Sequence, residues 1–116
     1  MEYVERFTDT EVEKIVDEGL IYMCACPAQV AETLRKVRNM YRYQLSCLRS
    51  PENDFRVHEA IAAVSVQVHA QLEDCLEAVL AIEQWDRKTL SMPVGLRERQ
   101  AKEISGDSQF FESTAK

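Results

Sequence analysis

The chain has 116 residues and carries 14 Lys and Arg against 20 Asp and Glu, so its formal net charge is −6. This length predicts a single domain that buries about two thirds of its unfolded surface without needing disulfides or metal ions. The acidity disfavours binding to nucleic acid or to an anionic membrane, unless a local basic patch overrides the overall charge.

Gly and Pro are scarce, with three of each, which favours long helices and few turns. The N-terminal sequence is acidic and lacks the apolar stretch of a signal peptide. The longest weakly polar run, Gly19 to Ala31, is too short to span a bilayer and contains Pro27. We therefore expect a soluble cytoplasmic protein with no membrane-spanning segment, whose four cysteines are reduced thiols.

The chain is expected to begin with a loose lead-in over residues 1–8. Thr8 and Glu11 have the spacing of a capping box, so a first helix is predicted from Asp9 or Thr10 to Met23 or Cys24. Its apolar residues recur at helical spacing and form the expected buried face, which consists of Val12, Ile15, Val16, Gly19, Leu20 and Met23.

A second helix is predicted from Pro27 to about Leu48 or Arg49, because proline suits the first position of a helix. Its apolar line consists of Val30, Leu34, Val37, Tyr41, Leu45 and Leu48. A row of arginines runs beside that line: Arg35, Arg38, Arg42 and Arg49. The first and third helices are acidic, so docking of this basic helix against them is expected to be assisted electrostatically.

The third helix is the longest and is predicted from about Asn53 to Asp86, with Asn53 or Asp54 as its N-cap. Its buried face is expected to end near Ile82 and to consist of Val57, Ile61, Val64, Val68, Leu72, Cys75, Val79 and Ile82, widened on one flank by Ala62, Leu76, Leu80 and the two histidines. The apolar arc is wide enough to need at least two neighbours. Since the second helix is shorter, we predict self-association, with a homodimer as the expected state.

A connector is expected over residues 87–95, followed by a short charged helix from Leu96 to Ile104. Residues 105–116 have the composition of a disordered tail. The predicted fold is all-α: an antiparallel three-helix bundle with one long central helix and a short C-terminal fourth helix, forming a single domain over residues 1–104.

The cysteines form the first candidate site. If the second and third helices form an antiparallel hairpin, Cys75 comes within about one turn of Cys24 and Cys26. Three thiolates could bind Zn²⁺ or Cu⁺, which accept soft sulfur ligands, or they could act as a redox group. The opposing interpretation is that they are small buried side chains, since free cysteine is commonly found in protein cores.

The arginine row forms the second candidate site. Arg35, Arg38 and Arg42 could bind an anion such as phosphate or nucleic acid, could pair with acids of the neighbouring helices, or could form a solvated face. His58 and His69 are separated by about 16 Å along a helix and cannot share a metal ion within one chain. Each is therefore expected to be a hydrogen-bonded histidine at the boundary of the core.

No phosphate-binding glycine loop, nucleophile elbow or HExxH motif occurs in the sequence. We therefore expect a small, non-enzymatic interaction protein, an adaptor or regulator that acts through its helix faces, self-associates and needs no cofactor. Its protein partner cannot be named from the sequence. The alternatives are a thiol-based metal-binding or redox protein and an anion- or nucleic-acid-binding protein.

Overall fold

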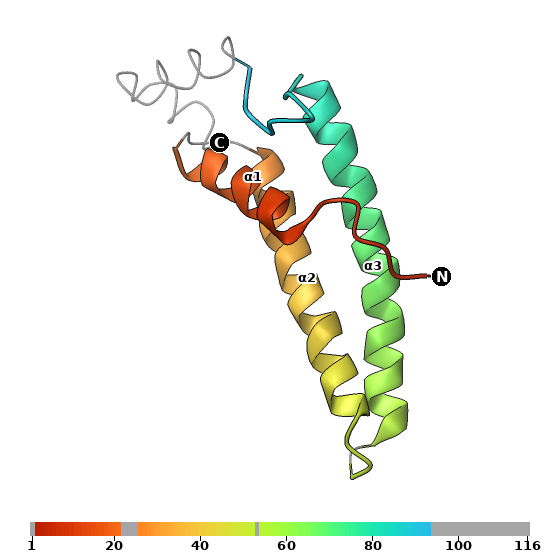
Figure 1. Cartoon of the computed structure of the whole chain (residues 1–116). Coiled ribbons are helices and arrows are strands. Elements are labelled where there is room, and N and C mark those ends of the chain that lie inside the picture. Colours follow the sequence, from red (N-terminus) through yellow and green to blue (C-terminus); the bar gives the residue numbers. More distant parts are fainter. Residues whose placement is uncertain (1, 22–25, 53, 94–116) are drawn as a thin grey trace, which may run out of the picture.

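The computed structural model describes residues 2–21, 26–52 and 54–93, and over these residues the protein is helical, without a strand. Helix α1 spans Asp9–Ile21, α2 spans Cys26–Leu48 and α3 spans Phe55–Ile82. Helices α2 and α3 form a long antiparallel hairpin, and α1 packs obliquely against the first half of α2 (Figure 1). The predicted fourth helix from Leu96 to Ile104 and the predicted tail over 105–116 lie outside the described residues.

The starts of two helices follow the signals in the sequence. The Thr8 hydroxyl accepts a hydrogen bond from the Glu11 backbone N–H at 3.1 Å, and the Glu11 carboxylate accepts one from the Thr8 N–H at 2.9 Å. At the start of α3, the Asp54 carboxylate accepts from the Arg56 N–H at 2.9 Å. The predicted capping box is therefore confirmed, and Asp54 is the N-cap of α3.

The hydrophobic core lies where α1, the first half of α2 and the second half of α3 meet. Segments outside the helices also contribute to it, and its buried members are Phe7, Val12, Ile15, Ala31, Leu34, Leu76, Leu80, Trp85, Leu90 and Met92. The expectation of a loose lead-in was wrong, because Phe7 is fully buried and anchors residues 2–8 against the helices. This segment crosses α3 in Figure 1.

Helix α3 ends in a Schellman motif that turns the chain back onto the core. The Trp85 N–H donates to the Leu80 carbonyl at 2.9 Å, and the Gln84 N–H donates to the Ala81 carbonyl at 3.1 Å. Gln84 adopts the left-handed conformation that this motif requires, with φ of 60°. Trp85, Leu90 and Met92 therefore close the core beyond the last turn of α3.

The orientation of α3 about its own axis differs from the prediction, because the buried side is centred on the predicted flank of the apolar stripe and not on the stripe itself. The side chains that α3 buries are Ala62, Ser65, His69, Glu73, Leu76 and Leu80. Val57, Val64 and Ile82 are instead 51%, 54% and 77% exposed, and Cys75 is exposed as well, so their predicted burial was wrong. The reason is a charged group of α2 that is itself buried and requires polar partners on α3.

Candidate functional site

That charged group is the guanidinium of Arg38, which is 1% exposed and lies between α2 and α3. Its Nε donates a hydrogen bond to His69 Nε2 at 2.9 Å, and Nη2 donates to Glu73 Oε2 at 3.2 Å and to the Phe7 carbonyl. Nη1 donates to Asp9 Oδ1 at 3.0 Å. Arg38, His69 and Glu73 form what we call the buried polar cluster, in which each charge has partners, as burial requires.

The hydrogen bond from Arg38 determines the protonation state and the tautomer of His69. An arginine Nε can only donate, so His69 Nε2 must accept, and the imidazole is neutral with its proton on Nδ1. Nδ1 lies 3.7 Å from Glu73 Oε1. Burial lowers the pKa of His69 below its ordinary value, and the Glu73 carboxylate opposes that shift only in part. The prediction of a boundary histidine was wrong for His69, which is buried.

Glu73 connects this cluster to the N-terminal segment. Its Oε2 accepts hydrogen bonds from the backbone N–H groups of Arg6 at 2.7 Å and Phe7 at 3.2 Å. Tyr3 stacks on Tyr41 of α2, with ring centroids 4.1 Å apart. The cluster is closed to solvent and its members bond one another, so its arrangement is suited to fastening residues 2–8 rather than to binding a substrate.

A second buried glutamate holds the C-terminal segment in the same manner. Glu18 of α1 is 2% exposed, and its Oε1 accepts from the Met92 backbone N–H at 3.1 Å. Its Oε2 accepts from Lys14 Nζ at 3.1 Å. Glu18 and Glu73 thus satisfy backbone donors of the two segments that flank the helices, which would otherwise be costly to bury.

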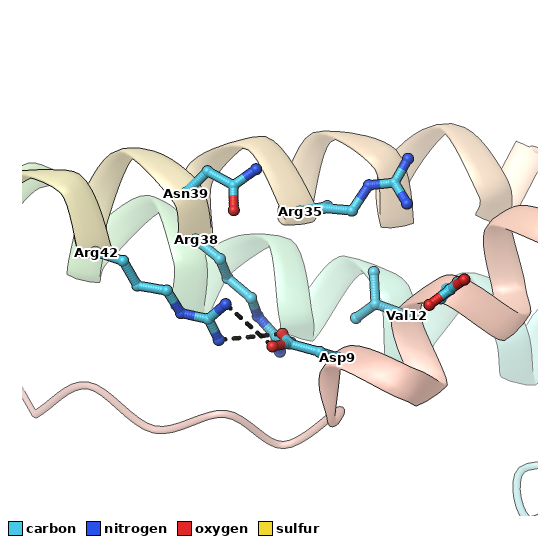
Figure 2. A pocket seen from close by; sticks show the side chains of 7 residues that line it. Asp9, Val12, Arg35, Arg38, Asn39 and Arg42 are labelled. Carbon is cyan, nitrogen blue, oxygen red and sulfur yellow. Dashed lines mark hydrogen bonds and ion pairs between the residues drawn. The ribbon is translucent and has the colours of Figure 1, made fainter.

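The three arginines predicted to bind an anion all line one pocket of about 200 Å³ between α1 and α2 (Figure 2). The Asp9 carboxylate already lies between two of them, 3.0 Å from Arg38 Nη1 and 3.0 Å from Arg42 Nη1. The hydrogen bond from Arg42 is the main cause that lowers the pKa of Asp9. Arg35 pairs with Glu32 on its own helix.

This arrangement supports the interpretation that the arginines pair with acids. Arg42 also donates to Glu5 Oε2 at 2.7 Å, and its pairing with Asp9 and Glu5 raises its pKa. An external anion would therefore compete with Asp9 for Arg42, and it would find Arg38 buried. Asn39 and the acid Glu13 also line the pocket, so an added anion would bind mainly through Arg35 and Asn39, against the repulsion of Asp9 and Glu13.

The structure describes three of the four cysteines. Cys26 at the start of α2 and Cys75 on α3 are exposed, and Cys47 is half-buried. Cys24 lies outside the described residues, so the predicted Cys24, Cys26 and Cys75 site stays a prediction. Among the described residues, no group of three or more His, Cys, Asp or Glu side chains is arranged to hold a metal ion.

The remaining candidate is the side of α3 that faces away from α2. Its residues are spaced alternately by four and three, and we call them the outer face: Val57, Ile61, Val64, Val68, Gln71, Cys75, Ala78 and Ile82. Ile61 and Val68 are half-buried and the others are exposed. No charged residue occurs among them, and the alternation is the seven-residue repeat of a coiled-coil seam.

The sequence predicted most of this row but assigned it to the core. Leu72 and Val79, which were predicted with the row, pack against the core, whereas Gln71 and Ala78 take the corresponding positions on the outside. The buried polar cluster was missed. Its signal was the spacing of four between His69 and Glu73, which places both on one side of a helix.

Within the described residues, none of the helices combines the length and the apolar character that a bilayer-crossing segment requires. Comparison with protein-family models, with curated proteins and with solved structures gives no match.

Proposed function

We propose that this protein is a small helical interaction protein, an adaptor or regulator without a catalytic role, which binds another protein chain through the outer face of α3. The observation that carries the proposal is the exposure of Val57, Val64 and Ile82 in one row along α3. Scattered surface hydrophobics are common, but an aligned apolar row is typical of a binding surface.

The shape of the surface indicates the kind of partner. Helix α3 has 28 residues and is therefore about 42 Å long. The outer face follows it from the first turn to the last and is narrow, so it matches an amphipathic helix laid alongside it. The exposed thiols of Cys26 and Cys75 favour a reducing compartment, and we place this activity in the cytoplasm as part of the same proposal.

The buried polar cluster supports this role indirectly. It holds α2 on the inner side of α3 and fastens residues 2–8 where they cross α3, and thereby fixes which side of α3 faces outward. The energetic cost of an exposed apolar row is tolerated in a folded protein when a partner covers the row.

A photo-cross-linker placed at position 64 tests the proposal in cells that produce the protein. We expect a covalent product between position 64 and an identified protein, whether a second copy of this chain or a different one. The matched control carries the cross-linker at the exposed position of Lys36 on α2, from which no such product is expected. Equal products from positions 64 and 36 would contradict the proposal.

The pocket beside α1 favours a second candidate, the binding of a small anion. Arg35, Asn39 and Arg42 line a pocket of about 200 Å³ there, together with the acids Asp9 and Glu13. Because Asp9 competes for Arg42, Asp9→Asn is expected to increase affinity for inorganic phosphate, and Arg35→Gln to decrease it. Calorimetric titration with phosphate measures both changes, and unchanged binding in both variants would exclude the site.

A further inference from the structure

We infer that the partner bound by the outer face of α3 is a second copy of this chain, with the two α3 helices packed antiparallel. This inference rests on the proposed function and names its partner. Four features of α3 support this pairing: the register of the outer face, the sizes of its side chains, the charges at its ends and the composition of its flank.

The register allows every position of the outer face to be paired. In an antiparallel pair with its two-fold axis level with the middle of α3, between His69 and Ala70, the outer faces meet layer by layer. There are four kinds of layer, and in each of them a residue of one copy faces a residue of the other: Val57 faces Ile82, Ile61 faces Ala78, Val64 faces Cys75, and Val68 faces Gln71.

The side-chain sizes favour this direction over a parallel pair. In the antiparallel pair, Ile61 faces Ala78 and Val64 faces Cys75, so a larger side chain meets a smaller one in both layers. A parallel pair would place each residue against its own copy, with thin layers at Ala78 and Cys75 and two Gln71 side chains facing each other. Close packing of nearly even layers therefore requires the antiparallel arrangement.

The charges at the two ends of α3 are complementary. The side chain of Arg56 is 90% exposed near the start of the helix, and its ion pair with Asp54 is solvated. The last turn of α3 has no basic residue and is followed by Glu83. Antiparallel packing brings Arg56 of one copy to the carboxyl end of the other α3, where the helix dipole favours a cation.

The flank that adjoins the outer face permits close approach. Its exposed residues are mostly small or uncharged, with one acid, Asp74, which pairs with Arg6 of the N-terminal segment: Ala60, Ala63, Gln67, Asp74 and Ala81. Two copies can therefore meet there with little direct charge repulsion, although each chain carries a net charge of −6. A strip about 42 Å long and 12 Å wide covers about 500 Å² on each copy, the lower limit for a specific interface, so we expect a micromolar dimer.

Disulfide cross-linking of the purified full chain tests both the partner and the direction. In a background with Cys24→Ser, Cys26→Ser and Cys47→Ser, Cys75 is the remaining thiol. Adding Val64→Cys places a second thiol opposite Cys75 of the other copy, at the separation that a disulfide spans. Under mild oxidation at tens of micromolar, we expect this variant to convert mostly to a covalent dimer joined between positions 64 and 75.

Two matched proteins serve as controls. The background with Cys75 alone, and the background with Lys36→Cys, should each give less than a tenth of that dimer, since the two Cys75 thiols lie about 16 Å apart along the antiparallel helices. Efficient dimer formation by Cys75 alone would indicate a parallel pair and overturn the inference. So would equal yields from Val64→Cys and Lys36→Cys.

The test separates this inference from the proposed function. If the unsubstituted chain sediments as a monomer while the cross-linker at position 64 captures a different protein in cells, the inference is overturned and the proposed function stands. If position 64 captures no protein in cells and no disulfide forms, both are overturned. A disulfide between positions 64 and 75, together with a dimer of the unsubstituted chain in sedimentation, supports both.

Discussion

The guanidinium of Arg38 donates hydrogen bonds to a histidine, two carboxylates and a backbone carbonyl, and its side chain is 1% exposed. Its partners come from α1, α3 and the N-terminal segment. Such a group adds little stability relative to well-packed apolar side chains, but removing one partner leaves an unpaired charge in the interior. Single substitutions in the buried polar cluster should therefore be far more costly than substitutions of exposed arginines.

Substitution of Arg38 by Met is expected to lower the free energy of unfolding by about 3–5 kcal/mol, because Glu73 then remains buried without its charged partner on α2. Arg35→Met serves as the control, since Arg35 is exposed and pairs within α2, and it should change stability by no more than about 0.5 kcal/mol. Urea unfolding measures both. Equal effects of the two substitutions on the free energy of unfolding would show that the buried contacts of Arg38 do not stabilise the fold.

The lowered pKa of His69 predicts a dependence of stability on pH. In the unfolded chain His69 takes up a proton below about pH 6.5, whereas in the folded protein its Nε2 is occupied by the hydrogen bond from Arg38. The unfolded state therefore binds more protons as the pH falls through this range, and stability is lost. The contributions of Glu5 and Asp9, whose pKa values are also lowered, are lost at lower pH, below their unfolded values.

The measurement is urea unfolding between pH 8 and pH 5.5 for the unsubstituted chain and for His69→Gln, in which the amide oxygen can still accept from Arg38. We expect stability of the unsubstituted chain to fall with pH and that of His69→Gln to fall less steeply. Identical slopes would contradict the assignment of His69 as neutral in the folded protein.

The sequence indicated in part that Arg38 contacts α3. In an antiparallel hairpin turning near Pro51, Arg38 lies level with Ser65, one turn before His69. The row of arginines nevertheless suggested an external anion, because a charged residue is rarely fully buried. Pairing of the arginines with neighbouring acids was among the predicted alternatives, and the structure supports it for Arg38 and Arg42.

Among the elements, the starts of the helices were predicted well because they depend on local chemistry, whereas α3 was predicted to run to about Asp86 and ends at Ile82 in the turn around Gln84. The capping pair Thr8 and Glu11, the cap Asp54 and the early position of Pro27 each act within one turn of chain. The rotation of α3 about its axis was not predictable in this way. Periodicity shows that α3 has an apolar side, but which side turns inward depends on Arg38, which is distant in sequence.

The N-terminal segment shows the same limit. Residues 2–8 lack the periodicity of a helix or a strand, so the sequence favoured a loose lead-in. Their order comes from long-range contacts, namely the burial of Phe7 and the hydrogen bonds to Glu73. A segment without regular structure can thus be an integral part of a small core.

Substitution of Phe7 by Ala is expected to lower the free energy of unfolding by about 3–4 kcal/mol, since a fully buried aromatic side chain is lost from the core. Val4→Ala is the control in the same segment, because Val4 is 56% exposed and should contribute about 0.5 kcal/mol or less. Thermal unfolding compares the two. If both variants unfold like the unsubstituted chain, residues 2–8 do not pack as described.

At the scale of the whole molecule, the core and the outer face of α3 lie on opposite sides of one helix. Helices α1 and α2 pack on the inner side, and the N-terminal segment crosses α3 at its flank, where Arg6 donates hydrogen bonds to Ala70 and Asp74 (Figure 1). The outer face, which carries no charged residue, receives none of them among the described residues. The sequence predicted self-association from the width of the apolar arc. That remains a prediction, and the structure now specifies the surface and the arrangement through which it would occur.

Sedimentation equilibrium of the full chain tests this central claim. We predict a monomer–dimer equilibrium at tens of micromolar and a dissociation constant at least about 100-fold weaker in Val64→Glu, because a carboxylate in the middle of the outer face cannot be buried unpaired. Lys36→Gln changes the net charge by the same amount away from that face and should leave the equilibrium unaltered. A strictly monomeric unsubstituted chain, or undiminished association of Val64→Glu, would contradict the account.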